Sequence, residues 1–267
     1  MRHIVPVSGG KDSAAMCVLL HKRLPDAEYV FCDTGSELRE TYDYLSKIER
    51  TLGIMIVRLG AERPFDKWLE YHKNYLPSPR ARWCTIQMKI KPYERYCGDD
   101  HITSYIGIRA DEAKRKGYFN PKKPHIKAAY PFIDEGIDLE GVQKLLTDSG
   151  LGMPSYYRWR TRSGCFFCFF QRRVEWVNLA EEHPDLFEKA CEYEEKSGYN
   201  KEGRKFTWVQ GMTLRELLGK KEAIKARFEK KVAREKAKKE NKQMTLVDLV
   251  DKVLDKESSQ KCDTCHI

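Results

Sequence analysis

The chain has 267 residues, 41% hydrophobic and 11% aromatic, so it can bury a substantial core and is not an intrinsically disordered protein. No run of eighteen apolar residues and no export signal is found, which argues against a membrane span and predicts a cytoplasmic protein. The formal net charge is +9, and residues 220–242 alone contribute +7 from eleven Lys and Arg against four Glu. The rest of the chain is therefore nearly neutral.

Short β-rich runs alternate with helical patterns along the first 108 residues. Strands are predicted at residues 4–7, 29–32, 55–59 and 103–108, and helices at residues 13–23, 36–52, 65–75 and 84–97. This alternation predicts βαβ units, hence an α/β fold with a doubly wound, mostly parallel sheet. Ligands bind such sheets beyond the carboxyl ends of the strands, where residues 8–13, 33–37 and 107–112 fall.

The character of the sequence changes after about residue 130. A segment rich in cysteine and aromatic residues, 156–176, is followed by predicted helices at 171–179 and 185–196 and by the basic stretch. That stretch either meets a polyanion or is a solvated helix with Glu/Lys pairs, and composition slightly favours the second interpretation. A short amphipathic helix is predicted at 244–254, before the tail CDTCHI.

The sequence SGGKDS, residues 8–13, separates the first predicted strand from the first predicted helix. Gly9 and Gly10 permit a tight turn in which backbone N–H groups converge on an anion, and the helix N-terminus adds partial positive charge. A turn in which Ser13 merely caps the helix explains the glycines, but not Lys11 and Asp12 together. The spacing fits neither the Walker loop nor the dinucleotide-binding G-x-G-x-x-G.

The stretch resembles the PP-loop of the N-type ATP pyrophosphatases and adenine nucleotide α-hydrolases, whose fold is of the HUP type. The resemblance implies that the loop holds the β,γ-pyrophosphate of ATP, with magnesium, while chemistry occurs at the α-phosphate. It assigns nucleotide binding to Ser8, Gly9, Gly10, Lys11, Asp12 and Ser13, and catalysis to the last three.

Two further loops resemble the branch that contains phosphoadenylylsulfate reductase and the small subunit of sulfate adenylyltransferase. The first is VFCDTGSELRETYDYL, and the second is YIGIRADEAKR. The resemblance adds to the nucleotide site Asp33, Thr34, Gly35, Gly107 and Arg109. Arg109 would place a guanidinium near phosphate as a catalytic group, with Glu112 orienting it.

Nine cysteines in a reducing compartment are expected as thiols, metal ligands or catalytic sulfur rather than disulfides. Cys165 and Cys168 form a C-x-x-C, whose two-residue spacing suits two thiolates on one metal or cluster, and four phenylalanines adjoin it. Cys17, Cys32 and Cys97 lie in strand or helix patterns and are assigned to the core.

The segments SPRARWCTIQMKIKP and RTRSGCFFCFFQRR resemble the DNA phosphorothioation pyrophosphatases of the DndC and SspD type over roughly residues 3–215. That resemblance implies a four-iron four-sulfur cluster on Cys84, Cys165 and Cys168, with zinc as the lesser alternative. A fourth ligand is not identified; the candidates are Cys262, Cys265 and Cys191.

These resemblances predict an ATP pyrophosphatase that adenylates an acceptor and enables sulfur transfer, with DNA favoured over tRNA as acceptor and a cysteine desulfurase as donor. A set of basic and aromatic residues is equally compatible with contacts to a nucleic-acid backbone and with a solvated surface: Lys73, Arg80, Arg82, Arg158, Arg160, Arg162, Tyr156, Tyr157 and Trp159. The alternatives are a nucleotide-sulfate reductase, a tRNA thiolation enzyme and a non-catalytic, metal-bearing nucleic-acid-binding protein.

Three parts of the chain are expected: a nucleotide-binding domain at 1–130, a cysteine-bearing segment at 131–219 and a basic extension at 220–267. No membrane partner is expected, and the sequence does not indicate an oligomeric state.

Overall fold

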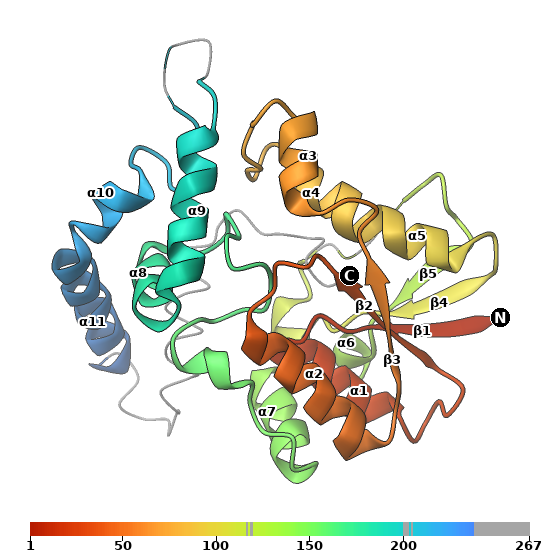
Figure 1. Ribbon diagram of the computed structural model, residues 1–267. Helices are drawn as coiled ribbons and strands as arrows, with labels where there is room; N and C mark the ends of the chain where they lie inside the picture. Colours follow the sequence, from red (N-terminus) through yellow and green to blue (C-terminus); the bar gives the residue numbers. More distant parts are fainter. Residues whose placement is uncertain (116, 118–119, 200–202, 204, 238–267) are drawn as a thin grey trace.

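A five-stranded sheet forms the centre of the N-terminal half of the molecule (Figure 1). The computed structural model describes residues 1–267 except 116, 118–119, 200–202, 204 and 238–267. Its strand order is β3 (Ile56–Gly60), β2 (Glu28–Asp33), β1 (Arg2–Pro6), β4 (Ile102–Tyr105) and β5 (Ile126–Ala129), and every neighbouring pair is parallel. The predicted doubly wound α/β fold is confirmed.

Helices cover both faces of the sheet (Figure 1). On one face lie α1 (Lys11–Leu20), α2 (Arg39–Leu52) and α7 (Leu139–Asp148), and on the other lies α5 (Lys91–Cys97). The side chains of β1 alternate between the two layers, since Val5 packs with α1 and α2 whereas Ile4 packs with α5. Cys17 belongs to the first layer and Cys32 and Cys97 to the second, so their core assignment is confirmed.

Helix α2 shows why the sequence folds as predicted here. Its buried residues Thr41, Tyr44, Leu45 and Ile48 recur at intervals of three and four, so they form one apolar stripe against the sheet. The helix ends at Gly53, whose φ of 66° is the left-handed conformation that closes many helices.

The predicted helix 84–97 is interrupted. It consists of α4 (Trp83–Thr85), one π-helical stretch (Ile86–Ile90) and α5. Pro92 explains the break, because proline has no N–H to donate and its ring clashes with the carbonyl four residues earlier. Such π-turns often occur at functional sites, and this one begins two residues after Cys84.

A second core joins the C-terminal helices to the N-terminal half. Helix α3 (Phe65–Tyr71) packs with α8 (Arg173–Glu182), α9 (Pro184–Lys196) and α10 (Leu214–Leu218) around aromatic side chains that include Trp208. Two elements of the remaining chain are the short α6 (Pro131–Asp134) and the basic α11 (Lys221–Ala237). The prediction of a helix at 244–254 lies outside the described residues. Among the helices that the structure describes, none is long and apolar enough to span a membrane.

Candidate functional site

The segment Ser8–Ser13 follows β1 and includes the first turn of α1, at the carboxyl end of the central strand (Figure 1). Its neighbour β4 leads from the same edge into the Gly107–Glu112 loop, and between these two strands the order of the sheet reverses. A crevice for ligands is expected at such a switch point. The fold thus brings two of the three predicted nucleotide-binding loops together.

Hydroxyl groups hold the loop in a closed turn. The Ser8 backbone N–H donates to Ser13 Oγ at 3.0 Å, and the Ser13 hydroxyl donates to the Gly10 carbonyl at 3.1 Å. Gly10 is the residue that precedes α1. It has no side chain that could accept a hydrogen bond from the first N–H groups of the helix. These donors, with the partial positive charge of the helix, are suited to phosphate oxygens.

Gly9 is required by both its conformation and its surroundings. Its φ is +73°, and a Cβ placed there would lie 2.6 Å from Thr41 Cγ2 on α2. Gly107 is confined as well, because a Cβ would come within 3.1 Å of the Asp12 carbonyl oxygen. The second glycine therefore lets the loop after β4 approach the start of α1.

Replacing Gly9 with alanine is expected to lower the free energy of unfolding by about 2–4 kcal/mol, from left-handed strain and overpacking against Thr41. Urea unfolding of the full chain measures the change. Gly35 also has a positive φ, of 66°, but no heavy atom would lie within 4 Å of an added Cβ. Gly35→Ala is thus the matched control and should cost the strain alone; equal losses in the two variants would contradict the steric explanation.

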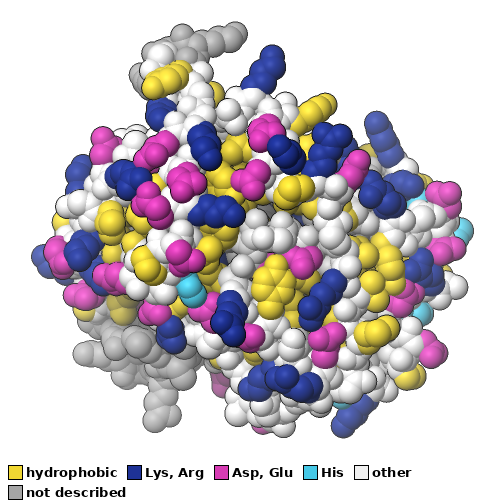
Figure 2. Space-filling model, viewed as in Figure 1, with side chains coloured by type: hydrophobic (Ala, Val, Ile, Leu, Met, Phe, Trp, Pro, Cys, Tyr) yellow, Lys and Arg dark blue, Asp and Glu magenta, His cyan; other side chains and the backbone are white. Residues whose placement is uncertain are grey.

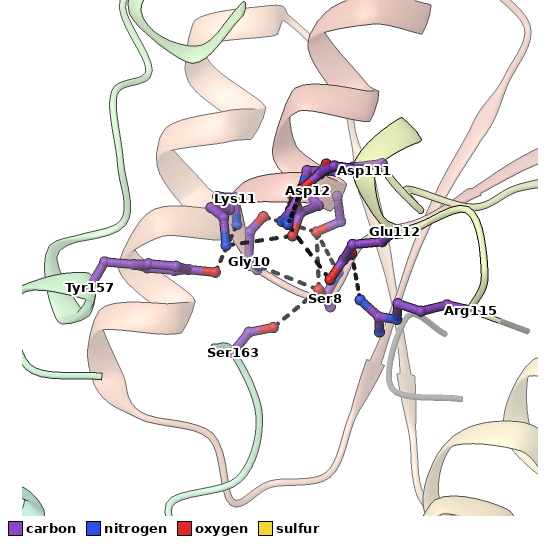
Figure 3. A network of polar contacts seen from close by, with 12 residues as sticks. Ser8, Gly10, Lys11, Asp12, Asp111, Glu112, Arg115, Tyr157 and Ser163 are labelled. Carbon is purple, nitrogen blue, oxygen red and sulfur yellow. Dashed lines mark hydrogen bonds and ion pairs between the residues drawn. The ribbon is translucent and has the colours of Figure 1, made fainter. Parts of the chain in front are cut away.

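Arg109 is buried and has three carboxylates around its guanidinium, those of Asp12, Asp111 and Glu112, which lie close together in Figure 3. Its guanidinium donates to Asp12 at 3.2 Å and to Asp111 at 2.9 and 3.1 Å, and Glu112 lies 3.6 Å away. Burial would lower the pKa of Arg109, but the charges of Asp12, Asp111 and Glu112 outweigh it and raise that pKa. In this arrangement Arg109 positions Asp12. A phosphate that binds to Arg109 would share the guanidinium with these carboxylates.

Residues from the C-terminal half contact the Ser8–Ser13 segment, called the phosphate loop below. The sequence did not predict these contacts. Tyr156 donates its hydroxyl to the Gly9 carbonyl at 2.8 Å, and the Tyr157 hydroxyl accepts the Lys11 N–H at 3.3 Å. The Lys11 ammonium lies 5.0 Å from the centre of the Tyr157 ring, and Ser163 donates to Ser8 Oγ at 3.1 Å (Figure 3). Sequence signals for these contacts are weak, since the partners lie about 150 residues apart.

Asp33, Thr34 and Gly35 follow β2 at the same edge of the sheet. Asp33 accepts the Gly35 N–H at 2.8 Å and the Tyr42 hydroxyl at 2.7 Å, which fixes the turn. Thr34 is directed elsewhere: its hydroxyl donates to Glu37 at 2.9 Å and lies 3.2 Å from Cys165 Sγ. Part of this predicted nucleotide-binding loop therefore contacts the cysteines.

The three cysteines predicted as metal ligands line one pocket of about 50 Å³. Its lining comprises Thr34, Pro77, Cys84, Thr85, Met88, Lys89, Arg162, Ser163, Gly164, Cys165, Phe167, Cys168, Phe169 and Phe170. Burial, and then the neighbouring Cys168, raise the pKa of Cys84 to about 11. Burial followed by the Glu37 charge also raises the pKa of Cys165, so both thiols are protonated near neutral pH without a metal.

The three thiols of this pocket are of the kind that bind a metal or an iron–sulfur cluster, and they lie around one cavity. Three thiols share an apolar shell with the Lys89 cation, whose charge would offset that of bound thiolates. The sulfurs are not yet arranged as a coordination shell, since no group of three His, Cys, Asp or Glu within the described residues forms a metal site. Cys191 is buried on α9 and is not in the pocket lining, while Cys262 and Cys265 lie outside the described residues.

The structure corrects four of the nine predicted nucleic-acid contacts. Tyr156, Tyr157, Trp159 and Arg160 are each at most 8% exposed, so they are core residues rather than a binding surface. Arg160 donates to the carbonyls of Gly164 and Cys165 at 3.0 and 2.8 Å. These bonds fix the turn that carries the C-x-x-C.

Replacing Arg160 with methionine is expected to lower the free energy of unfolding by about 3 kcal/mol. It would leave two partly buried carbonyls without their donor. It would also remove a cation that, with Arg172, lowers the pKa of the buried Glu175 against the effect of burial. Chemical denaturation measures the loss. The control is Arg158→Met, because Arg158 is exposed and pairs with Glu182 at the surface, which is worth about 0–1 kcal/mol. A stable Arg160→Met protein would show that the guanidinium does not hold the turn.

The basic stretch is partly balanced where it is described. Lys225 on α11 pairs with Glu181 on α8 at 2.6 Å. Figure 2 shows Lys and Arg interspersed with Asp and Glu on the face in view, rather than collected in one basic patch. On this face the solvated-helix interpretation is the better one.

The first part of the chain is similar to known proteins. Residues 2–124 match the family model of the phosphoadenosine phosphosulfate reductase domain. A protein of Methanocaldococcus jannaschii, MJ0066, is 32% identical over 195 residues, 70% of this chain and 40% of the relative. Adenosine 5'-phosphosulfate reductase 1 of Bacillus subtilis is 27% identical over 114 residues, 42% of this chain and 48% of that protein. The chain spans about half, or less, of the length of these relatives.

The solved structures also include this fold. The phosphoadenylyl-sulfate reductase of Candida auris superposes with a TM-score of 0.50 at 13% identity, covering 62% of this chain and 81% of that one. At this identity the likeness concerns the fold alone.

Proposed function

We propose that the chain binds ATP at Ser8–Ser13 and uses it for sulfur transfer, since residues 2–124 match the family model of the phosphoadenosine phosphosulfate reductase domain. The observation that supports this most directly is a shared residue. Ser163 bonds to Ser8 of the phosphate loop and also lines the pocket of Cys84, Cys165 and Cys168. A nucleotide phosphate and a sulfur atom would therefore be held at adjacent positions.

The proposed reaction begins with the outer two phosphates on the loop. An oxygen of the acceptor attacks the α-phosphate, the bond to the β-phosphate breaks, and pyrophosphate leaves with the bonding electron pair. Backbone N–H groups of the loop and the Lys11 ammonium offset the charge that develops on the leaving group. Magnesium would bind the same phosphates. The acceptor is then linked to AMP, a better leaving group than an oxide.

Sulfur transfer is the second half of the proposal. A hydrosulfide attacks the adenylated atom, and AMP departs with the electron pair of the bond that breaks. When the sulfur comes instead from the persulfide of a desulfurase, its terminal sulfur attacks, AMP departs, and a thiol then reduces the disulfide that joins product and donor. Cys84, Cys165 and Cys168 are the residues that would hold an iron–sulfur cluster, which would supply a binding site for the incoming sulfur. A DNA phosphodiester is the proposed acceptor, with tRNA as the alternative.

The test is release of pyrophosphate from ATP by the anaerobically purified full chain, with single-stranded DNA, tRNA or neither supplied. Sulfur in the recovered nucleic acid is then measured by mass spectrometry. Pyrophosphate release that depends on one acceptor, with sulfur gained by that acceptor, supports the proposal. No release with any acceptor contradicts it.

Reduction of a nucleotide sulfate is a second candidate, favoured by the family of the domain at residues 2–124. Such an enzyme releases sulfite from adenylyl sulfate or its 3'-phosphorylated form, and consumes thiol rather than ATP. Sulfite formation without pyrophosphate release would select this candidate over the first.

A further inference from the structure

Two arginines that the sequence marked as possible backbone contacts meet at one phenylalanine. The guanidinium of Arg162 lies 5.4 Å from the centre of the Phe170 ring, and that of Arg82 lies 5.8 Å from it. Both distances are within the range of a cation–π interaction. Arg162 and Phe170 also line the cysteine pocket, so this cluster lies beside the thiols.

The pocket carries positive charge with no carboxylate among its lining residues. Its two cationic side chains are Lys89 and Arg162. Among the described residues no ion pair of Arg162 is found, whereas the Glu37 carboxylate accepts from Thr34 and lies 3.8 Å from Cys165 Sγ. An oxyanion is therefore attracted to Arg162 rather than to Cys165, and the planar guanidinium presents paired donors to it.

Aromatic rings adjoin these charges. Phe169 and Phe170 are half-buried, and their ring centres lie 4.4 Å apart with the planes tilted by 43°. Bases stack on such rings and on arginine planes in proteins that bind single strands, whereas a duplex hides the faces of its bases. A phosphate flanked by a planar base is thus the ligand that suits both features.

The cluster is next to the proposed phosphate loop. Ser163 follows Arg162 directly, and its hydroxyl donates to Ser8 Oγ at 3.1 Å. A phosphodiester held by Arg162 would therefore lie near the nucleotide phosphates, where an attacking oxygen is needed.

We propose that Arg162, Arg82 and Phe170 bind one nucleotide of a single-stranded nucleic acid, with the phosphodiester on the arginines and the base on the phenylalanine. The choice of ligand rests on the proposed function, but binding can be measured without ATP. DNA and RNA share this chemistry, and the experiment distinguishes them.

The experiment measures fluorescence anisotropy of labelled single-stranded DNA, single-stranded RNA and duplex DNA of one sequence with the full chain. Phe170→Leu should weaken binding of the preferred single strand about 5- to 150-fold, because one stacking contact is lost. Phe170→Tyr keeps the ring and should restore binding. Arg162→Ala should reduce the slope of log affinity against log salt by about 0.7, which Phe170→Leu should leave unchanged.

Arg23→Ala is the control. Arg23 is exposed just beyond the end of α1 and is paired with Glu135 at 2.6 Å, so affinity and salt slope should stay at the wild-type values. The proposal is overturned if Arg23→Ala costs as much as Arg162→Ala, if Phe170→Leu binds normally, or if the duplex binds as tightly as the single strands. Binding that depends on Arg162 without any pyrophosphate release would support this site and contradict the proposed reaction, so the two failures are distinguishable.

Discussion

Replacing Lys11 with alanine is expected to lower pyrophosphate release from ATP by about 10²–10³-fold. Lys11 is 5% exposed at the start of α1, where its ammonium lies 5.0 Å from the Tyr157 ring centre and 3.8 Å from Asp12. The side chain is therefore held near the loop before a nucleotide arrives. Its removal withdraws the charge that offsets the leaving pyrophosphate, so kcat should fall more than ATP affinity.

The fold should survive this substitution. Asp12 keeps its bond to Arg109, and the loop keeps its hydroxyl contacts. Lys22 is an exposed lysine just beyond the end of α1, so Lys22→Ala is the matched control and should release pyrophosphate at the wild-type rate. Full activity in Lys11→Ala, with an unchanged melting temperature, would rule out the proposed role of the lysine.

Replacing Cys165 with alanine is expected to lower iron affinity by at least about 100-fold. Loss of an outer partner of a metal ligand already costs 10–100-fold, and Cys165 is proposed as a ligand itself. The measurement is iron and sulfide content, with visible absorption, after anaerobic reconstitution of the full chain. Cys84→Ala and Cys168→Ala should behave alike, since both cysteines line the same pocket.

Cys191 provides the comparison within the same chain. It is 1% exposed in the C-terminal core and does not line the pocket, so Cys191→Ala should bind iron normally. Iron loss in Cys191→Ala as well would make it the missing fourth ligand. Stoichiometric zinc in a colourless protein would instead show that the site is not an iron–sulfur site.

Local signals explain the parts of the fold that could be predicted. The strand, glycine turn and helix around residues 2–20 are contiguous, so sequence pattern and turn chemistry act on the same few residues. Helix α7 is not among the predicted elements although Asp138 caps it, since the residues beyond about 130 were assigned as a whole to the cysteine-bearing segment. The π-helical turn at Ile86–Ile90 was missed because periodicity alone does not distinguish it from α-helix.

The contacts between loops depend on tertiary structure. Tyr157 and Ser163 reach the phosphate loop only because the C-terminal half folds back over it. Likewise, an arginine is typical of a surface, and only the structure shows that Arg160 is buried to hold a turn. Residue type made both arginines candidate contacts, but it could not distinguish the buried Arg160 from Arg162, which lines the cysteine pocket.

The packing of α7 on α1 has a consequence for any attempt to isolate the matched domain. The match ends at residue 124, whereas edge strand β5 begins at Ile126 and α7 contributes Val142 and Leu146 to the core beneath α1. A fragment truncated after residue 124 would expose those apolar neighbours on α1 and leave the backbone of β4 unpaired along one side. Residues 2–124 should therefore aggregate as an expressed fragment, and an autonomous unit has to extend at least through α7.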